Sequence, residues 1–113
     1  MKTANLYQDI TYNENKPIIN VLFETDFTKE IRIAMQKGTV MKEHKTSYAI
    51  VVEVLEGNID FGVEHETQHM SKGDLIALDG NVPHDLKANE NSIIRLTLTK
   101  YDNVKRVEKV VET

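Results

Sequence analysis

The chain has 113 residues, of which 40% are hydrophobic and 28% charged, with no cysteine and a formal net charge of −4 at pH 7. This length suits a single domain, and the lack of cysteine excludes disulfides and thiolate sites, so we expect a reducing, cytoplasmic setting. Scattered Lys and Arg argue against nucleic acid as a partner, and because no apolar run approaches the roughly 20 residues of a membrane span, we expect neither a membrane segment nor a signal peptide.

The first third of the chain predicts an arm and two strands. Residues 1–16 are polar and end before a proline, which predicts an extended arm that adds an edge strand here or on a partner subunit. Residues 17–23 form a nearly continuous apolar run, as in a strand covered on both faces. Residues 30–36 alternate between apolar and polar side chains, which predicts a half-buried strand.

The centre of the chain predicts two further strands and a loop. Residues 48–55 are rich in β-branched side chains and stop before Gly57, which can adopt the positive φ of a tight turn. Residues 59–64 resume the alternation, so we predict that these two strands pair as a hairpin. Residues 65–72 are polar and predict a connection in which His65 and His69 are exposed rather than a metal pair.

The end of the chain predicts more short strands and then a change of pattern. Residues 75–78 and 92–99 have the composition of strands, whereas the valines of residues 101–113 recur at roughly helical spacing and predict a short C-terminal helix. Short strands closed by Gly or Asn turns are typical of an all-β sandwich or barrel. We therefore predict one all-β domain over residues 1–113, with residues 1–16 as its arm and 101–113 as its tail.

Two blocks of glycine and histidine lie in the centre of the chain. The first block reads Gly38, five residues, His44, Lys45, Thr46, three residues, Ile50, six residues and Gly57. The second block follows after fifteen residues and reads Gly73, five residues, Asp79, Gly80, Asn81, two residues, His84, three residues and Ala88. This spacing resembles the paired motif of the cupin superfamily, G-x5-H-x-H-x3-4-E-x6-G and G-x5-P-x-G-x2-H-x3-N. The resemblance implies a double-stranded β-helix, the cupin jelly-roll barrel of two packed antiparallel sheets, commonly paired into a homodimer.

The resemblance also implies where a metal would be held. In metal-dependent cupins the two His and the Glu of the first block, with the His of the second, hold one divalent metal, and those positions are His44, Thr46, Ile50 and His84 here. Only the two histidines are metal ligands by type, whereas a catalytic metal site normally has three protein ligands. We therefore predict a degraded metal site without a resident cofactor, in which a divalent transition metal would have His44 and His84 alone.

The same positions predict a pocket in the barrel interior. We expect His44, Thr46, Tyr48, Ile50 and His84 to line a mixed polar and apolar cavity that binds a small molecule. No pair of nucleophile and base is recognisable, so no catalytic residue is assigned. Met35, Met41 and Phe61 are expected to fill the core.

Two other functions stay open from the sequence. One is a metal-dependent cupin enzyme of the isomerase or dioxygenase type, completed by Glu43 or Asp85, although each of these is adjacent to an inward histidine and should point outward. The other is a sensor or interaction module without chemistry. Whether the chain is an enzyme is therefore left open.

Overall fold

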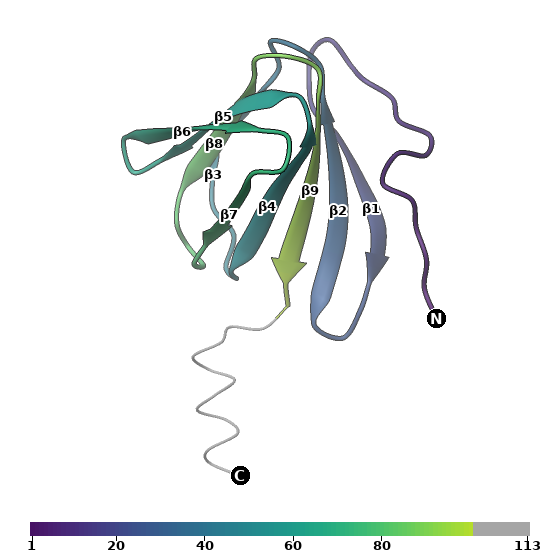
Figure 1. The fold of residues 1–113 in the computed structure, drawn as a ribbon. Coiled ribbons are helices and arrows are strands. Elements are labelled where there is room, and N and C mark those ends of the chain that lie inside the picture. Colours follow the sequence, from purple (N-terminus) through teal and green to yellow (C-terminus); the bar gives the residue numbers. More distant parts are fainter. Residues whose placement is uncertain (101–113) are drawn as a thin grey trace, which may run out of the picture.

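The computed structural model describes residues 1–100, and the predicted helix over residues 101–113 lies outside them. The described residues form nine β-strands and no helix (Figure 1). Residues 1–100 therefore contain no helix that is long and apolar enough to cross a membrane. The strands are β1 (Ile18–Glu24), β2 (Thr28–Met35), β3 (Val40–His44), β4 (Ile50–Glu56), β5 (Asn58–Val63), β6 (Glu66–Ser71), β7 (Leu75–Leu78), β8 (His84–Ala88) and β9 (Ser92–Thr99).

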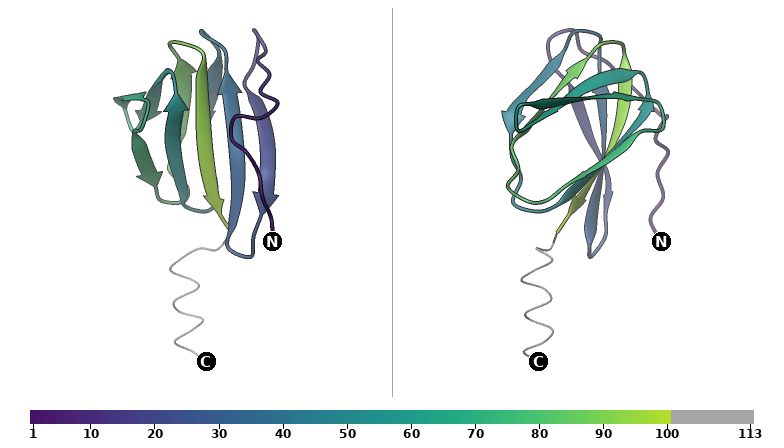
Figure 2. Two further views of the ribbon diagram at one scale, coloured as in Figure 1. Left: turned by 45° about the vertical axis from the view of Figure 1, so that its right-hand side comes forward. Right: turned by 60° about the vertical axis from the view of Figure 1, so that its left-hand side comes forward.

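The strands form two antiparallel sheets packed face to face, as Figure 2 shows. One sheet has the order β1-β2-β9-β4-β7 and the other has the order β3-β8-β5-β6. Alternate residues of each strand point between the sheets, where they form one apolar core that includes Met35, Val54, Ile59, Phe61 and Ile94. The predicted all-β jelly roll and the core positions of Met35 and Phe61 are thus confirmed.

The predicted hairpin of residues 48–55 and 59–64 is wrong, although both strands exist. β4 pairs with β7 and β9, whereas β5 pairs with β6 and β8, so the chain crosses from one sheet to the other at Gly57. Gly57 has a φ of 94°, and a side chain there would lie 2.7 Å from Ser92 Cα. The glycine therefore serves a crossing between the sheets instead of a tight hairpin.

Strand β1 is less covered than its composition predicts. Ile19 and Val21 lie opposite Ile33 and Ile31 of β2, on the face that points toward the core, yet they are 56% and 52% exposed. β1 is an outer strand of the five-stranded sheet, which has one strand more than the sheet it faces. The expectation of a strand covered on both faces is therefore wrong, because β1 lies beyond the opposing sheet.

Strand β2, in contrast, is buried on both faces because the N-terminal arm covers its outer side (Figure 2). The buried guanidinium of Arg32 donates to the main-chain carbonyls of Leu6 at 3.2 Å, Gln8 at 2.6 Å and Asp9 at 3.4 Å. These carbonyls bond to a side chain instead of a strand, so the arm adds no strand to either sheet of this chain. The hydrogen bonds from Arg32 to the arm therefore correct two expectations, an edge strand on this chain and a half-buried β2. Addition of the arm to a partner subunit stays a prediction.

Strand β6 occupies residues that the sequence predicts to be a loop. It pairs with β5 along its whole length, from Glu66 opposite Val63 to Ser71 opposite Asn58. Only Met70 of this strand is buried, because β6 is the outer strand of the smaller sheet. An outer strand that faces water on most sides carries almost no apolar signal.

Candidate functional site

His44 and His84 meet at one end of the barrel. His44 ends β3, His84 begins β8, and the two lie directly opposite each other in the antiparallel pair. Opposed residues of antiparallel strands project to the same face of a sheet. The two imidazole rings have their centroids 4.4 Å apart, with their planes tilted by 60°. The two histidines that the motif singles out are therefore direct neighbours in the fold.

Both imidazoles are held by the same kind of hydrogen bond. Nδ1 of His44 lies 2.7 Å from the carbonyl oxygen of Lys42, and Nδ1 of His84 lies 2.9 Å from that of Val82, each two residues earlier. Because a carbonyl only accepts, each Nδ1 carries the hydrogen, and each Nε2 has the lone pair. Neither Nε2 bonds to any of residues 1–100. The pair thus offers two acceptor nitrogens that point away from their own backbones.

His84 is the buried member of the pair, with 4% of its surface exposed, whereas His44 is exposed. Burial lowers the pKa of His84 below its ordinary value; its hydrogen bond to the Val82 carbonyl opposes this, and the neighbouring His44 lowers the pKa further. The ring of His84 stacks on Phe61 with 5.5 Å between centroids and 9° between planes. His84 is therefore a neutral, fixed acceptor at neutral pH. The sequence predicts only a core position for Phe61. Phe61 and Val63 lie on the same face of β5, and Val63 is paired with His84, so this register is the signal for the contact between Phe61 and His84.

The other three predicted pocket residues have different surroundings. The hydroxyl of Thr46 donates to the main-chain carbonyl of Tyr48 at 2.8 Å. The side chain of Tyr48 is exposed, whereas Ile50 is buried in the apolar core. The hydroxyl hydrogen of Thr46 is thus directed to the backbone, and Ile50 belongs to the core.

The two loops that lead to the histidine pair are tied together. The main-chain N–H of Asn81 donates to the carbonyl of Thr46 at 2.7 Å, and Gly80 packs so closely on Ser47 that an added side-chain carbon would lie 3.0 Å from the Ser47 carbonyl carbon. Asn81 has a φ of 65°, at the position where the cupin motif has glycine. Asparagine tolerates this conformation better than most residues, so the departure from the motif preserves the turn.

An open hollow of about 500 Å³ lies at the ends of β4, β5 and β7, and neither histidine is among its lining residues. Its lining includes Ile50, Val63, Leu78 and Val82. Val63 lies opposite His84 in the β5–β8 pair, and Val82 supplies the carbonyl that holds the His84 ring. Of the five predicted pocket residues, Ile50 thus lines this hollow and His84 flanks it.

The residues at the barrel mouth do not fit the four-ligand metal site of the family motif. Thr46 and Ile50 take the places of a histidine and a carboxylate, and residues 1–100 contain no group of three or more His, Cys, Asp or Glu that could hold a metal. Glu43 is exposed, and the carboxylate of Asp85 lies against Gly62 on the outer face of the sheet. The structure therefore leaves the two imidazoles without a carboxylate partner.

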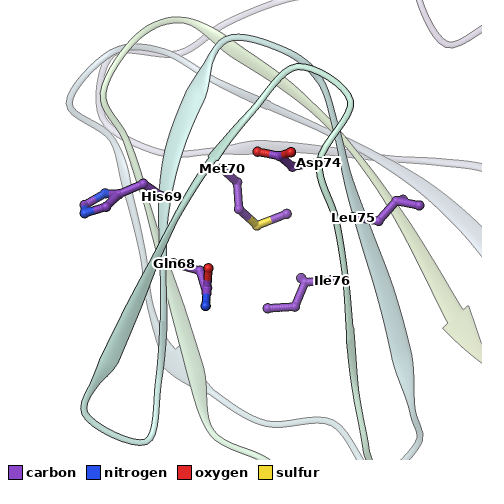
Figure 3. A pocket seen from close by; sticks show the side chains of 6 residues that line it. All are labelled: Gln68, His69, Met70, Asp74, Leu75 and Ile76. Carbon is purple, nitrogen blue, oxygen red and sulfur yellow. The ribbon is translucent and has the colours of Figure 1, made fainter.

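A second hollow, of about 370 Å³, opens between β6 and β7 (Figure 3). Met70, Ile76 and Gln68 point into it, whereas His69 turns away from it. Nδ1 of His69 lies 2.6 Å from Oδ1 of Asp60, and the His69 side chain is 75% exposed. The predicted exposure of His69 is confirmed, but the residue lies in a strand and pairs with an acid that the sequence does not single out.

Comparison with known proteins agrees with this architecture. A conserved protein of unknown function from Streptococcus pyogenes has 21% identity and a TM-score of 0.76, with 88% of each chain covered. An RmlC-like cupin protein from Desulfovibrio desulfuricans has 18% identity and a TM-score of 0.80, over 88% of this chain and 96% of that one. The protein TT1209 from Thermus thermophilus has 19% identity and a TM-score of 0.79, over 88% of this chain and 97% of that one.

At these identities the solved structures establish the fold alone. No curated protein matches the sequence. The family model described as "Cupin domain" matches residues 31–100, which is more than half of the chain and includes both motif blocks. The motif, the two-sheet barrel and this match together place the chain in the cupin family.

Proposed function

We propose that this chain binds a small molecule at the mouth of its barrel, next to His44 and His84, and that it does so without a resident transition metal. The observation that carries the proposal is the pair of imidazoles, 4.4 Å apart, whose Nε2 atoms have no partner among residues 1–100. His84 lies beside a hollow that is lined by apolar side chains together with Glu64, Asp79 and Thr99. A concave apolar surface with a few fixed polar groups is the usual form of a small-molecule site.

The metal content of the purified protein tests the second half of the proposal. In buffer free of chelators we expect less than about one tenth of an equivalent of transition metal, because two ligands hold a metal weakly. The matched variant Thr46→His with Ile50→Glu has the complete ligand set of the family motif and should take up about one equivalent. Near-stoichiometric metal in the wild type that disappears in His44→Ala and His84→Ala would contradict the proposal.

Native mass spectrometry tests the first half. The chain should carry or take up a small molecule from a cell extract, and His44→Ala should lose it. His44 is exposed, so this variant removes a site residue with little effect on the core. His65→Ala, an exposed histidine on the β5–β6 turn, is the control that should retain the molecule. Equal retention by both variants would refute binding at the pair.

A metal-dependent cupin enzyme, of the isomerase or dioxygenase type, is the second candidate. One observation favours it: both Nδ1 atoms donate to main-chain carbonyls, as the second nitrogen of a metal-ligating histidine usually does. The metal analysis above decides between the two candidates.

We also propose that the chain works as a homodimer in the cytoplasm, which follows from the family resemblance and the lack of cysteine. Light scattering should give twice the chain mass of 12.9 kDa. A mass equal to that of one chain would contradict the dimer. Tight binding of a macromolecule without any bound small molecule would instead favour an interaction module.

A further inference from the structure

We infer that the molecule bound at this site is neutral and rich in hydroxyl groups, and that two neighbouring hydroxyls donate to Nε2 of His44 and Nε2 of His84. The inference rests on the proposed function and adds the chemical class of the ligand to it. It follows from the direction of the hydrogen bonds at the site and from the charges around it.

The first step concerns hydrogen-bond direction. Because each Nδ1 hydrogen is committed to a main-chain carbonyl, both free ring nitrogens accept and neither donates. The Thr46 hydroxyl, the nearest side-chain donor along the loop, already donates to the Tyr48 carbonyl. A group that only accepts, such as a carboxylate or a phosphate oxygen, therefore finds no partner in this pair.

The second step concerns charge. Two of the residues that line the hollow, Glu64 and Asp79, are acidic, which further disfavours an anion there. Both are exposed, so solvent weakens their repulsion of an anion and their attraction for a cation alike, and neither imidazole bonds to a carboxylate of residues 1–100. A cation would thus lose hydration at the pair without a buried opposite charge in return.

The third step concerns shape. The ring centroids are 4.4 Å apart, so one molecule with two neighbouring donor groups is large enough to reach both rings. Ile50, Val63 and Leu78 give the adjoining hollow an apolar wall. A cyclic polyol has both features, since its hydroxyls lie at the edge of the ring and its C–H groups form an apolar face. The class that fits is therefore a neutral cyclic polyol or monosaccharide.

The test uses three probes on one scaffold: methyl glucoside, which is neutral, glucuronate, which is an anion, and glucosamine, which is a cation. Long-range ¹H–¹⁵N spectra of the full chain at pH 7.5 report each histidine nitrogen separately. We expect methyl glucoside to shift Nε2 of His44 and His84 in a saturable manner, while His65 and His69 stay unchanged as internal controls. Glucuronate and glucosamine should bind at least tenfold more weakly.

The same spectra test the premise, because they show which nitrogen carries the hydrogen. A hydrogen on Nε2 of either ring, or tighter binding of glucuronate or glucosamine, overturns the inference. If none of the probes shifts the pair but native mass spectrometry finds a small molecule that His44→Ala loses, the inference fails and the proposed function stands. If the pair binds neither the probes nor a molecule from the extract, both fail. His84→Gln, which retains an acceptor at a buried position, should keep part of the methyl glucoside response, whereas His44→Ala should lose at least tenfold.

Discussion

The contact between Gly80 and Ser47 should control both the stability of the barrel mouth and the geometry of the histidine pair. In Gly80→Ala, the added carbon would lie 3.0 Å from the Ser47 carbonyl carbon and closer still to its oxygen, whereas ordinary contact begins at 3.4 Å. Both atoms belong to the backbone, so the two loops must separate, and the hydrogen bond from Asn81 N to the Thr46 carbonyl is lost. Overpacking of about 1–3 kcal/mol and about 1 kcal/mol for the hydrogen bond give an expected loss of about 2–4 kcal/mol.

Gly62→Ala provides the matched control. Its added carbon would also lie 3.0 Å from a carbon atom, Cγ of Asp85, but this atom belongs to a side chain that can rotate away. Since alanine is better than glycine in a strand by about 0.5–1 kcal/mol, we expect a net change within about 1 kcal/mol. Urea denaturation followed by circular dichroism gives both free energies of unfolding. A Gly80→Ala protein as stable as the wild type, or equal losses in the two variants, would refute the proposed loop contact.

Three further predictions follow from the same contacts. Arg32→Met should lower the free energy of unfolding by about 2–4 kcal/mol and speed proteolysis of the N-terminal arm, because three carbonyls lose their donor, and an arm that resists protease as in the wild type would contradict this role of Arg32. Burial lowers the pKa of His84, so the unfolded state binds this proton first as pH falls. The free energy of unfolding should therefore decrease from about pH 6.5 down to the folded pKa. His84→Gln should flatten this slope in denaturation experiments between about pH 8 and pH 5. The Asp60 carboxyl has a lowered pKa because it accepts hydrogen bonds from His69 and Asn89, so its contribution to stability should be present above about pH 4 and disappear as pH falls through the folded pKa. Since the Asp60–His69 pair is exposed, Asp60→Asn should lower the free energy of unfolding by less than about 1 kcal/mol at pH 7. A larger loss would contradict a purely surface role for this pair.

The spacing of the two motif blocks predicted the barrel because it fixes turns and strand lengths. Gly38, Gly57 and Gly73 have φ values of 90°, 94° and 92°, a conformation that few residues other than glycine adopt. Asn81 occupies a fourth position at which the motif has glycine, and it also has a positive φ, of 65°. These backbone requirements are local, so they can be read from the chain itself.

Strand partners could not be predicted in the same way. The alternation of β4 and β5 indicates which side chains are buried, but it does not indicate which strand lies alongside, so a crossing at Gly57 looks like a hairpin. β6 has one buried residue, Met70, and therefore lacks the apolar pattern of a strand. In both cases the missing information belongs to the tertiary arrangement of the sheets.

Burial of β1 and β2 was mispredicted for a related reason. A strand's own residues do not specify how far the opposing sheet extends, and Ile19 and Val21 lie beyond its edge. Nor does the polar composition of the arm reveal that Arg32 holds it through main-chain carbonyls, an interaction that is independent of the arm's side chains. These hydrogen bonds to the arm all come from one residue of the sheet, Arg32.

The substitution at position 50 connects the metal question with the ligand question. In the family motif this position supplies a carboxylate, which would be anionic at the barrel mouth; here Ile50 is buried in the core and lines the hollow beside His84. A lone carboxylate at so buried a position would cost several kcal/mol without a metal to compensate its charge, which explains why an apolar residue is compatible with a two-histidine site. Ile50 therefore removes an anionic ligand and at the same time supplies an apolar wall. The result is a pair of imidazoles without a carboxylate partner and with apolar surface close to His84, and our proposal of a small-molecule ligand in place of a metal ion rests on this arrangement.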